Sequence, residues 1–92
     1  MKKSLRLLID IGNTQVKLGI WSEGNLVRCS KCTHKNLRTT VGKYKSTIFE
    51  RVIYVSVVSS DLENKIKNYL EKTFSIKPTR IKSTSSMLGV KN

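Results

Sequence analysis

The chain of 92 residues contains few of the residues that mark fibrous, disulfide-bonded or membrane-spanning proteins. One proline and five glycines exclude a collagen-like or low-complexity chain. Two cysteines, Cys29 and Cys32, are too few for a disulfide scaffold. The apolar stretch near the N-terminus is interrupted by Arg6 and Asp10, so it predicts neither a secretory signal nor a membrane helix. We therefore expect a cytoplasmic protein with reduced cysteines and no membrane partner.

Acidic residues are also scarce, because six Asp and Glu stand against 18 Lys and Arg, which gives a net charge of +12. This charge favours anionic partners such as nucleic acid, phosphorylated ligands or an acidic protein surface. The basic residues are spread along the chain without a block of five or six, which is more typical of a solvated surface. The apolar content of 38% permits a folded core, and the length allows one small domain.

Short apolar stretches separated by turn residues predict three antiparallel strands at the start of the chain, over residues 5–11, 15–21 and 26–31. The turns between them are expected at Gly12–Thr14 and at Glu23–Asn25. In the second strand, Lys17 alternates with Val16 and Leu18 and is therefore expected on the opposite face.

The rest of the chain predicts two helices and two further strands. An amphipathic helix is expected from the spacing of Leu37, Val41, Tyr44 and Ile48. The β-branched stretch 51–58 predicts a central strand, and Ser60 and Glu63 fit a capping box at the start of the next helix. The apolar stripe of that helix consists of Leu62, Ile66, Leu70 and Phe74. A short strand is expected at 79–81, so the predicted order is β-β-β-α-β-α-β.

The candidate site is the DIGNT segment that begins at Asp10. Asp10 ends a buried strand, and its carboxylate could hold Mg²⁺ directly or through water. Gly12 lets the backbone approach a phosphate and can adopt a positive φ, while Asn13 and Thr14 can donate to phosphate oxygens. Lys17 could place a point charge near the same phosphates. The alternative is an ordinary hairpin in which Asp10 caps its own turn.

Cys29, Cys32 and His34 offer three candidate metal ligands, whereas a structural zinc site needs four. Two cysteines three positions apart on a strand point to opposite faces. We therefore expect two ordinary thiols at a strand end. His34, the one histidine, is expected to be a polar residue of a loop or of a helix start.

The DIGNT turn, the three-strand opening and Val55-Ser56-Val57-Val58 before a capped helix resemble the type III pantothenate kinases of the actin-like ATPase superfamily. The tail Gly89-Val90-Lys91-Asn92 is similar to the segment that leads into that family's substrate-binding region. The resemblance implies an α/β lobe of the actin-like ATPase (ribonuclease H-like) type, with a mixed sheet and helices packed on it. It covers the whole chain but only the N-terminal part of the family's pattern. We therefore expect residues 1–92 to form a single N-terminal lobe that lacks the C-terminal lobe.

The resemblance further implies an activity, namely ATP-dependent phosphorylation of pantothenate, the first step toward coenzyme A. It implies a full-length homodimer that uses Mg²⁺ or another divalent cation and a monovalent cation, K⁺ or NH₄⁺. The pantothenate contacts and the proton-accepting aspartate of the family are expected beyond Asn92. Because phosphoryl transfer depends on positioning both partners, the isolated chain is expected to be inactive.

The family's site residues can be carried over by position. Asp10 is similar to the catalytic, metal-associated aspartate, and Gly12, Asn13 and Thr14 are similar to the first phosphate-binding turn. Lys17 matches a lysine of some branches. The stretch 56–58 matches a signature near the site, without an assigned contact.

Two functions of other classes stay open. One is a small basic module that binds nucleic acid or an acidic partner, and the other is a regulatory protein built on the same fold. The kinase hypothesis predicts Mg²⁺-dependent ATP affinity that requires Asp10. The module hypothesis predicts nucleic-acid affinity that falls steeply with salt and does not depend on Asp10.

Overall fold

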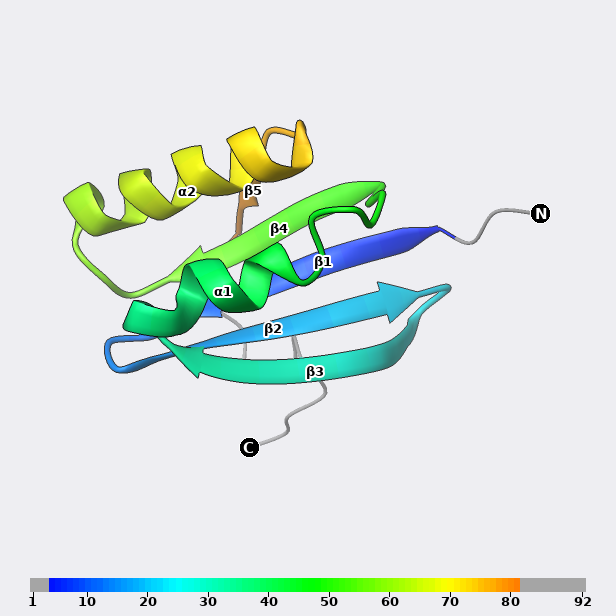
Figure 1. Cartoon of the computed structure of the whole chain (residues 1–92), viewed down its shortest axis with the longest axis horizontal. Coiled ribbons are helices and arrows are strands. Elements are labelled where there is room, and N and C mark those ends of the chain that lie inside the picture. Colours follow the sequence, from blue (N-terminus) through cyan, green and yellow to red (C-terminus); the bar gives the residue numbers. More distant parts are fainter. Residues whose placement is uncertain (1–3, 82–92) are drawn as a thin grey trace.

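A five-stranded sheet with the order β3-β2-β1-β4-β5 forms the body of the molecule (Figure 1). The computed structural model describes residues 4–81. The strands are β1 (Leu5–Ile11), β2 (Gln15–Ser22), β3 (Asn25–Thr33), β4 (Arg51–Ser56) and β5 (Thr79–Arg80). Strand β2 pairs antiparallel with β1 and β3, whereas β4 pairs parallel with β1 and β5. The sheet is therefore mixed, and the predicted element order is confirmed.

The β2–β3 hairpin follows from its two turn residues. Glu23 and Gly24 have φ values of 52° and 83°, and positive φ at both central positions is the property of a type I′ turn. This turn matches the right-handed twist of the strands and pairs Ser22 with Asn25. Strand β3 then continues to Thr33, two residues beyond its predicted end.

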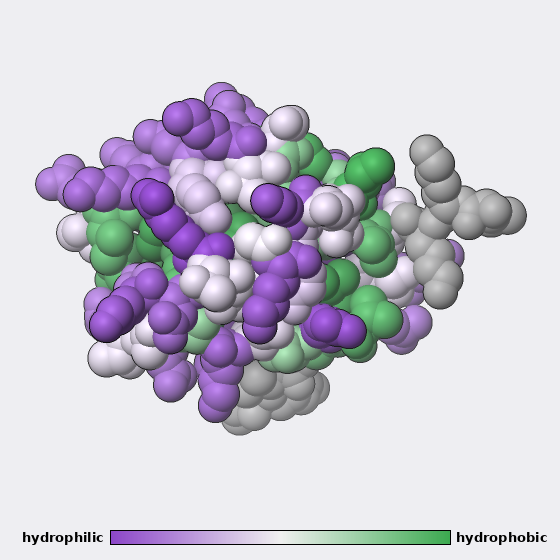
Figure 2. Space-filling view, viewed as in Figure 1, coloured by the Kyte–Doolittle hydropathy of each residue, from purple (hydrophilic) through white to green (hydrophobic). Residues whose placement is uncertain are grey.

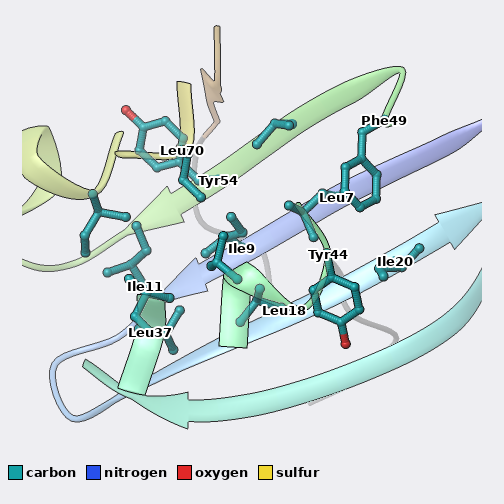
Figure 3. Packing of buried hydrophobic residues seen from close by; sticks show 14 residues of the cluster. Leu7, Ile9, Ile11, Leu18, Ile20, Leu37, Tyr44, Phe49, Tyr54 and Leu70 are labelled. Atoms are coloured by element: carbon teal, nitrogen blue, oxygen red, sulfur yellow. The ribbon is translucent and has the colours of Figure 1, made fainter. Parts of the chain in front are cut away.

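Helices η1 (His34–Asn36) and α1 (Leu37–Gly42) connect β3 to β4, and α2 (Ser60–Phe74) connects β4 to β5. Both α helices lie over the same face of the sheet (Figure 1). Alternate side chains of the inner strands point toward them and form one buried cluster (Figure 3). The side chains exposed by less than 2% include Leu7, Ile9, Ile11, Val16, Leu18, Val41, Val52 and Leu70.

The predicted helix over residues 37–48 is wrong in its second half, because α1 ends at Gly42, a poor helix former. Beyond it, the chain makes turns whose hydrogen bonds join residues three apart, such as Thr47 N–H to the Tyr44 carbonyl at 2.8 Å. These turns contain about three residues instead of 3.6. The phase of the apolar stripe is therefore lost, and Ile48 is 85% exposed.

Phe49, not Ile48, is buried in the cluster that also contains Tyr44. Its ring packs edge-on against Phe74, with 5.3 Å between the ring centroids. The chain then enters β4, which ends at Ser56, two residues earlier than predicted. Just beyond this end, the Ser56 hydroxyl accepts a hydrogen bond from Val58 N–H at 3.3 Å.

The start of α2 also differs from the predicted capping box by one residue. The N-cap is Ser59, whose Oγ accepts from Leu62 N–H at 3.4 Å, while Ser60 is the first helical residue. Glu63 does not reach back to the cap, because its carboxylate accepts from the Tyr54 hydroxyl at 3.1 Å and from Arg80 Nε at 3.0 Å. Burial, and then the bond to Glu63, raise the pKa of Tyr54, so its hydroxyl remains a donor.

Replacing Ser59 with alanine is expected to lower the free energy of unfolding by about 1 kcal/mol, because the first turn of α2 loses its cap. Ser60→Ala is the matched control and is expected to change it by less than about 0.5 kcal/mol. Urea denaturation of the two variants measures both values. A larger loss for Ser60→Ala would place the cap where the sequence predicted it.

The similarity of Gly89–Asn92 to a family segment cannot be compared with the structure, because these residues lie outside the described range. That residues 1–92 form a single N-terminal lobe also stays a prediction. Of the helices between residues 4 and 81, none combines the length and the apolar character that crossing a bilayer requires.

Candidate phosphate-binding site

The DIGNT turn lies at the edge of the sheet where the parallel strands β1 and β4 both end (Figure 1, left). The end of β3 and the starts of α1 and α2 lie at the same edge. The Ile11 carbonyl accepts from Val57 N–H at 3.1 Å, so the segment after β4 runs directly beside the turn. In open α/β sheets this edge is where ligands commonly bind.

A short backbone hydrogen bond closes the turn, from Gly12 N–H to the Gln15 carbonyl oxygen at 2.9 Å. A Cβ at position 12 would lie 2.9 Å from that same oxygen, so only glycine fits without a shift of the turn. The backbone of Gly12 lies outside the left-handed region, so the positive φ considered for it is not used. The glycine is required by close approach of the backbone, not by its dihedral angles.

Asp10 and Lys17 stand directly opposite each other in the β1–β2 register. Both lie on the face that points away from the buried cluster, and both are partly exposed. The ion pairs among residues 4–81 are Arg6–Glu50 and Arg80–Glu63, so Asp10 and Lys17 do not close on each other. The structure thus brings the predicted carboxylate and the predicted lysine to one hollow without an ion pair between them.

The β1–β2 hairpin of the alternative is present, but the cap by Asp10 is not among the hydrogen bonds of residues 4–81. The turn is closed by the backbone, and no described residue donates a hydrogen bond to the Asp10 carboxylate. Asn13 and Thr14 are exposed, and neither side chain bonds to another described residue. The side chains of Asn13 and Thr14 are therefore open to solvent, where a ligand could meet them.

The hollow at the turn has a volume of about 180 Å³ and is lined by Asp10, Gly12, Thr14, Gln15 and Lys17. Sites for whole small ligands usually measure roughly 300–1,000 Å³. At about 180 Å³, the hollow is smaller than the sites that enclose whole ligands of nucleotide size. A larger hollow of about 510 Å³, which includes Trp21 and Ile53, lies toward the start of β1 and does not reach the turn.

His34 is the residue of this edge that the sequence interpretation missed. Its Nε2 lies 2.6 Å from the carbonyl oxygen of Gly12, 22 residues earlier in the chain. The pairing of β3 with β2 could have located it. Thr33 pairs with Gln15, so the residue after Thr33 lies beside the turn. Because the predicted strand stopped at residue 31, that register could not be extended to His34.

The prediction that Cys29 and Cys32 point to opposite faces of their strand is confirmed. Cys29 is exposed, whereas Cys32 is partly buried and packs against the core, so they occupy opposite faces of β3. Among residues 4–81, no three His, Cys, Asp or Glu side chains converge as a set of metal ligands. Asp10 is therefore the acidic group that this part of the chain could offer to a cation at the turn.

Comparison with solved structures finds the same sheet-and-helix arrangement in much larger proteins. An exopolyphosphatase-like protein matches with a TM-score of 0.57 at 11% identity, covering 88% of this chain and 33% of that protein. Two structures of the Ppx/GppA family from Aquifex aeolicus match with TM-scores of 0.53 and 0.52 at 17% and 16% identity, each covering 88% of this chain and 36% of theirs. The chain thus spans about a third of these proteins, and at such identities the likeness concerns the fold alone.

These neighbours place the molecule among proteins of the actin-like ATPase fold, as an α/β region with a mixed sheet. A search of curated proteins finds no match. Residues 6–92 match the profile of the type III pantothenate kinases. Because the match extends over nearly the whole sequence, the chain belongs to the type III pantothenate kinase family and corresponds to its N-terminal region.

Proposed function

We propose that this chain supplies the ATP phosphate-binding lobe of a kinase that phosphorylates pantothenate, the first step of coenzyme A synthesis. The observation that carries the proposal is the meeting of Asp10, Lys17 and the Gly12 turn around one hollow at the carboxyl edge of β1 and β4. The family match supports the choice of pantothenate as the acceptor. The active enzyme is proposed to be a longer, cytoplasmic homodimer that contains this lobe.

Each residue of the hollow has a proposed task. Asp10 would hold a divalent cation, directly or through water, and Mg²⁺, when bound, supplies positive charge that neutralises the phosphates. The backbone amides of Asn13 and Thr14 and the Thr14 hydroxyl would donate to phosphate oxygens, because none of them has an acceptor among the described residues, whereas the Gly12 N–H is taken by Gln15. Lys17 would add a point charge from the neighbouring strand.

Other parts of the reaction are proposed to depend on residues beyond Asn92. The pantothenate contacts, the group that accepts the hydroxyl proton, and the site of the monovalent cation, K⁺ or NH₄⁺, belong there. A hollow of about 180 Å³ cannot enclose both substrates. The isolated lobe is therefore proposed to bind the phosphate end of ATP without turnover.

A second candidate function rests on a basic groove over the helices. A hollow of about 420 Å³ is lined by Arg38, Lys65, Asn68, Tyr69 and Lys72, and the guanidinium of Arg38 stacks over the Tyr69 ring at 5.1 Å. Hydrophilic side chains dominate this side of the molecule (Figure 2). Three cations beside an aromatic ring are typical of surfaces that bind single-stranded nucleic acid. This groove would serve the binding-module alternative.

Paired lysine variants distinguish the two functions. Lys17→Gln is expected to weaken MgADP binding roughly fivefold, since a partly exposed charge contributes about 1 kcal/mol, and to leave oligonucleotide binding unchanged. Lys72 lies in the last turn of α2, so Lys72→Gln removes the same charge at a site away from the DIGNT turn and is the control for MgADP binding. Calorimetry with MgADP, and fluorescence titration of a single-stranded oligonucleotide over a range of salt, measure both. Binding of the oligonucleotide alone, weakened by Lys72→Gln, would replace the kinase proposal with the module.

A further inference from the structure

The contact between His34 and Gly12 has a defined donor. A backbone carbonyl oxygen only accepts hydrogen bonds, so the Nε2 of His34, 2.6 Å away, carries the hydrogen. The other ring nitrogen, Nδ1, is buried and has no partner among the described residues. The bond to Gly12 is therefore the polar contact that the structure shows for this ring.

The backbone on both sides of His34 is fixed by hydrogen bonds. Thr33 is the last residue of β3 and pairs with Gln15, at the start of β2. Its hydroxyl also accepts from Asn36 N–H at 3.3 Å and so caps η1, of which His34 is the first residue. His34 is thus attached to the ladder that begins directly after the turn, and its position relative to the turn is fixed by the backbone.

The consequence for the turn follows from the geometry of a peptide bond. The bond between Gly12 and Asn13 is trans and planar, so its C=O and its N–H point in opposite directions. Because the Gly12 oxygen is held toward His34, the Asn13 N–H must point away from His34. Rotation of this peptide unit would break the bond to His34 and turn the Asn13 donor inward.

We propose that His34 is a positioning residue for the phosphate-binding turn. Its Nε2–H fixes the Gly12–Asn13 peptide so that the Asn13 N–H is presented to a phosphate oxygen. The inference rests on the proposed function of the turn, because it assigns a purpose to one of the amides there. Together with the Gly12 N–H bond to Gln15, it makes the donors of the turn preorganised, so binding does not have to order them.

The test uses the 92-residue chain labelled with ¹⁵N and compares three variants. His34→Gln can place an amide N–H near the position of Nε2, whereas His34→Leu removes the donor. Asn36→Ala is the control in the same 3₁₀ turn, since its exposed side chain makes no cap bond. Without ligand, we expect His34→Leu to move the amide signals of Gly12, Asn13 and Thr14, and His34→Gln to restore them. Long-range ¹H–¹⁵N spectra of the wild type are expected to show the ring hydrogen on Nε2.

With MgADP as the probe, the dissociation constant is expected to rise about tenfold for His34→Leu and less than about threefold for His34→Gln and Asn36→Ala. Unchanged turn signals together with an unchanged dissociation constant in His34→Leu would overturn the inference. If His34→Leu does not fold, His34→Asn replaces it, because its shorter side chain cannot reach the Gly12 oxygen. If the wild type binds no MgADP, the proposed function fails, and the ligand-free spectra alone decide whether His34 holds the turn.

Discussion

The substitution Asp10→Asn is expected to abolish the Mg²⁺ dependence of nucleotide binding and, in the longer kinase proposed above, to lower kcat/KM roughly 100-fold or more. Asparagine preserves the size of the side chain and removes its charge, and Mg²⁺ strongly prefers carboxylate oxygen. The loss is large because no set of three acidic, His or Cys groups converges among residues 4–81 to take over. Calorimetry with ADP, with and without Mg²⁺, measures the effect on the lobe.

The matched control is Asp61→Asn, which changes the other aspartate of the sequence. Asp61 is exposed in the first turn of α2, so its loss removes the same charge without touching the hollow. MgADP affinity is expected to change less than about twofold, the size of a weak surface charge effect. Equal losses in both variants would mean that net charge, not cation binding by Asp10, governs the affinity.

Gly12→Ala is expected to lower the free energy of unfolding by about 1–3 kcal/mol and to remove measurable MgADP binding. The new Cβ would meet the Gln15 carbonyl oxygen at 2.9 Å. That oxygen belongs to the backbone, so it cannot swing aside as a side chain would. The turn itself must open, which breaks its closing hydrogen bond and displaces the amides proposed to bind phosphate. Urea denaturation and calorimetry measure the two effects.

Gly42→Ala serves as the counterpart, because a Cβ at position 42 would meet nothing within 4 Å. Gly42 is the last residue of α1, where alanine is the better helix former. The free energy of unfolding is expected to rise by up to about 1 kcal/mol, with nucleotide binding unchanged. A stabilising Gly12→Ala would show that the turn tolerates a side chain and that close approach is not the reason for its glycine.

The elements whose prediction was confirmed are those in which local sequence and long-range packing agree. The alternation of apolar and polar residues in 15–21 correctly predicted the face of Lys17, and the Glu23-Gly24 pair correctly predicted the turn between β2 and β3. The DIGNT turn was found because an acid, a glycine and small polar residues after a buried strand form a local pattern. The meeting of Asp10 and Lys17 then followed from a short hairpin.

The features that the sequence did not predict depend on contacts between residues far apart in the chain, or on small changes in the helical repeat. Ile48 fits a helical stripe, but the tighter turns after Gly42 bring Phe49 to the core in its place. Ser60 and Glu63 also have the spacing of a capping box, but the Glu63 carboxylate accepts hydrogen bonds from Tyr54 and Arg80 instead. Such competition between local and tertiary partners cannot be read from spacing alone.

The position of β1 between β2 and β4 also fixes an order of events during synthesis. Its antiparallel partner follows after three turn residues, and hairpins of this kind form in about 1–10 μs. Its parallel partner comes much later, since Arg6 pairs with Arg51, 45 residues further on. At about 5–20 residues per second, a ribosome needs roughly 2–9 s to make that stretch. For this period one edge of β1 has no strand beside it, so the nascent chain can form the Gly12–Thr14 turn before the strand that carries Asp10 is protected on both edges.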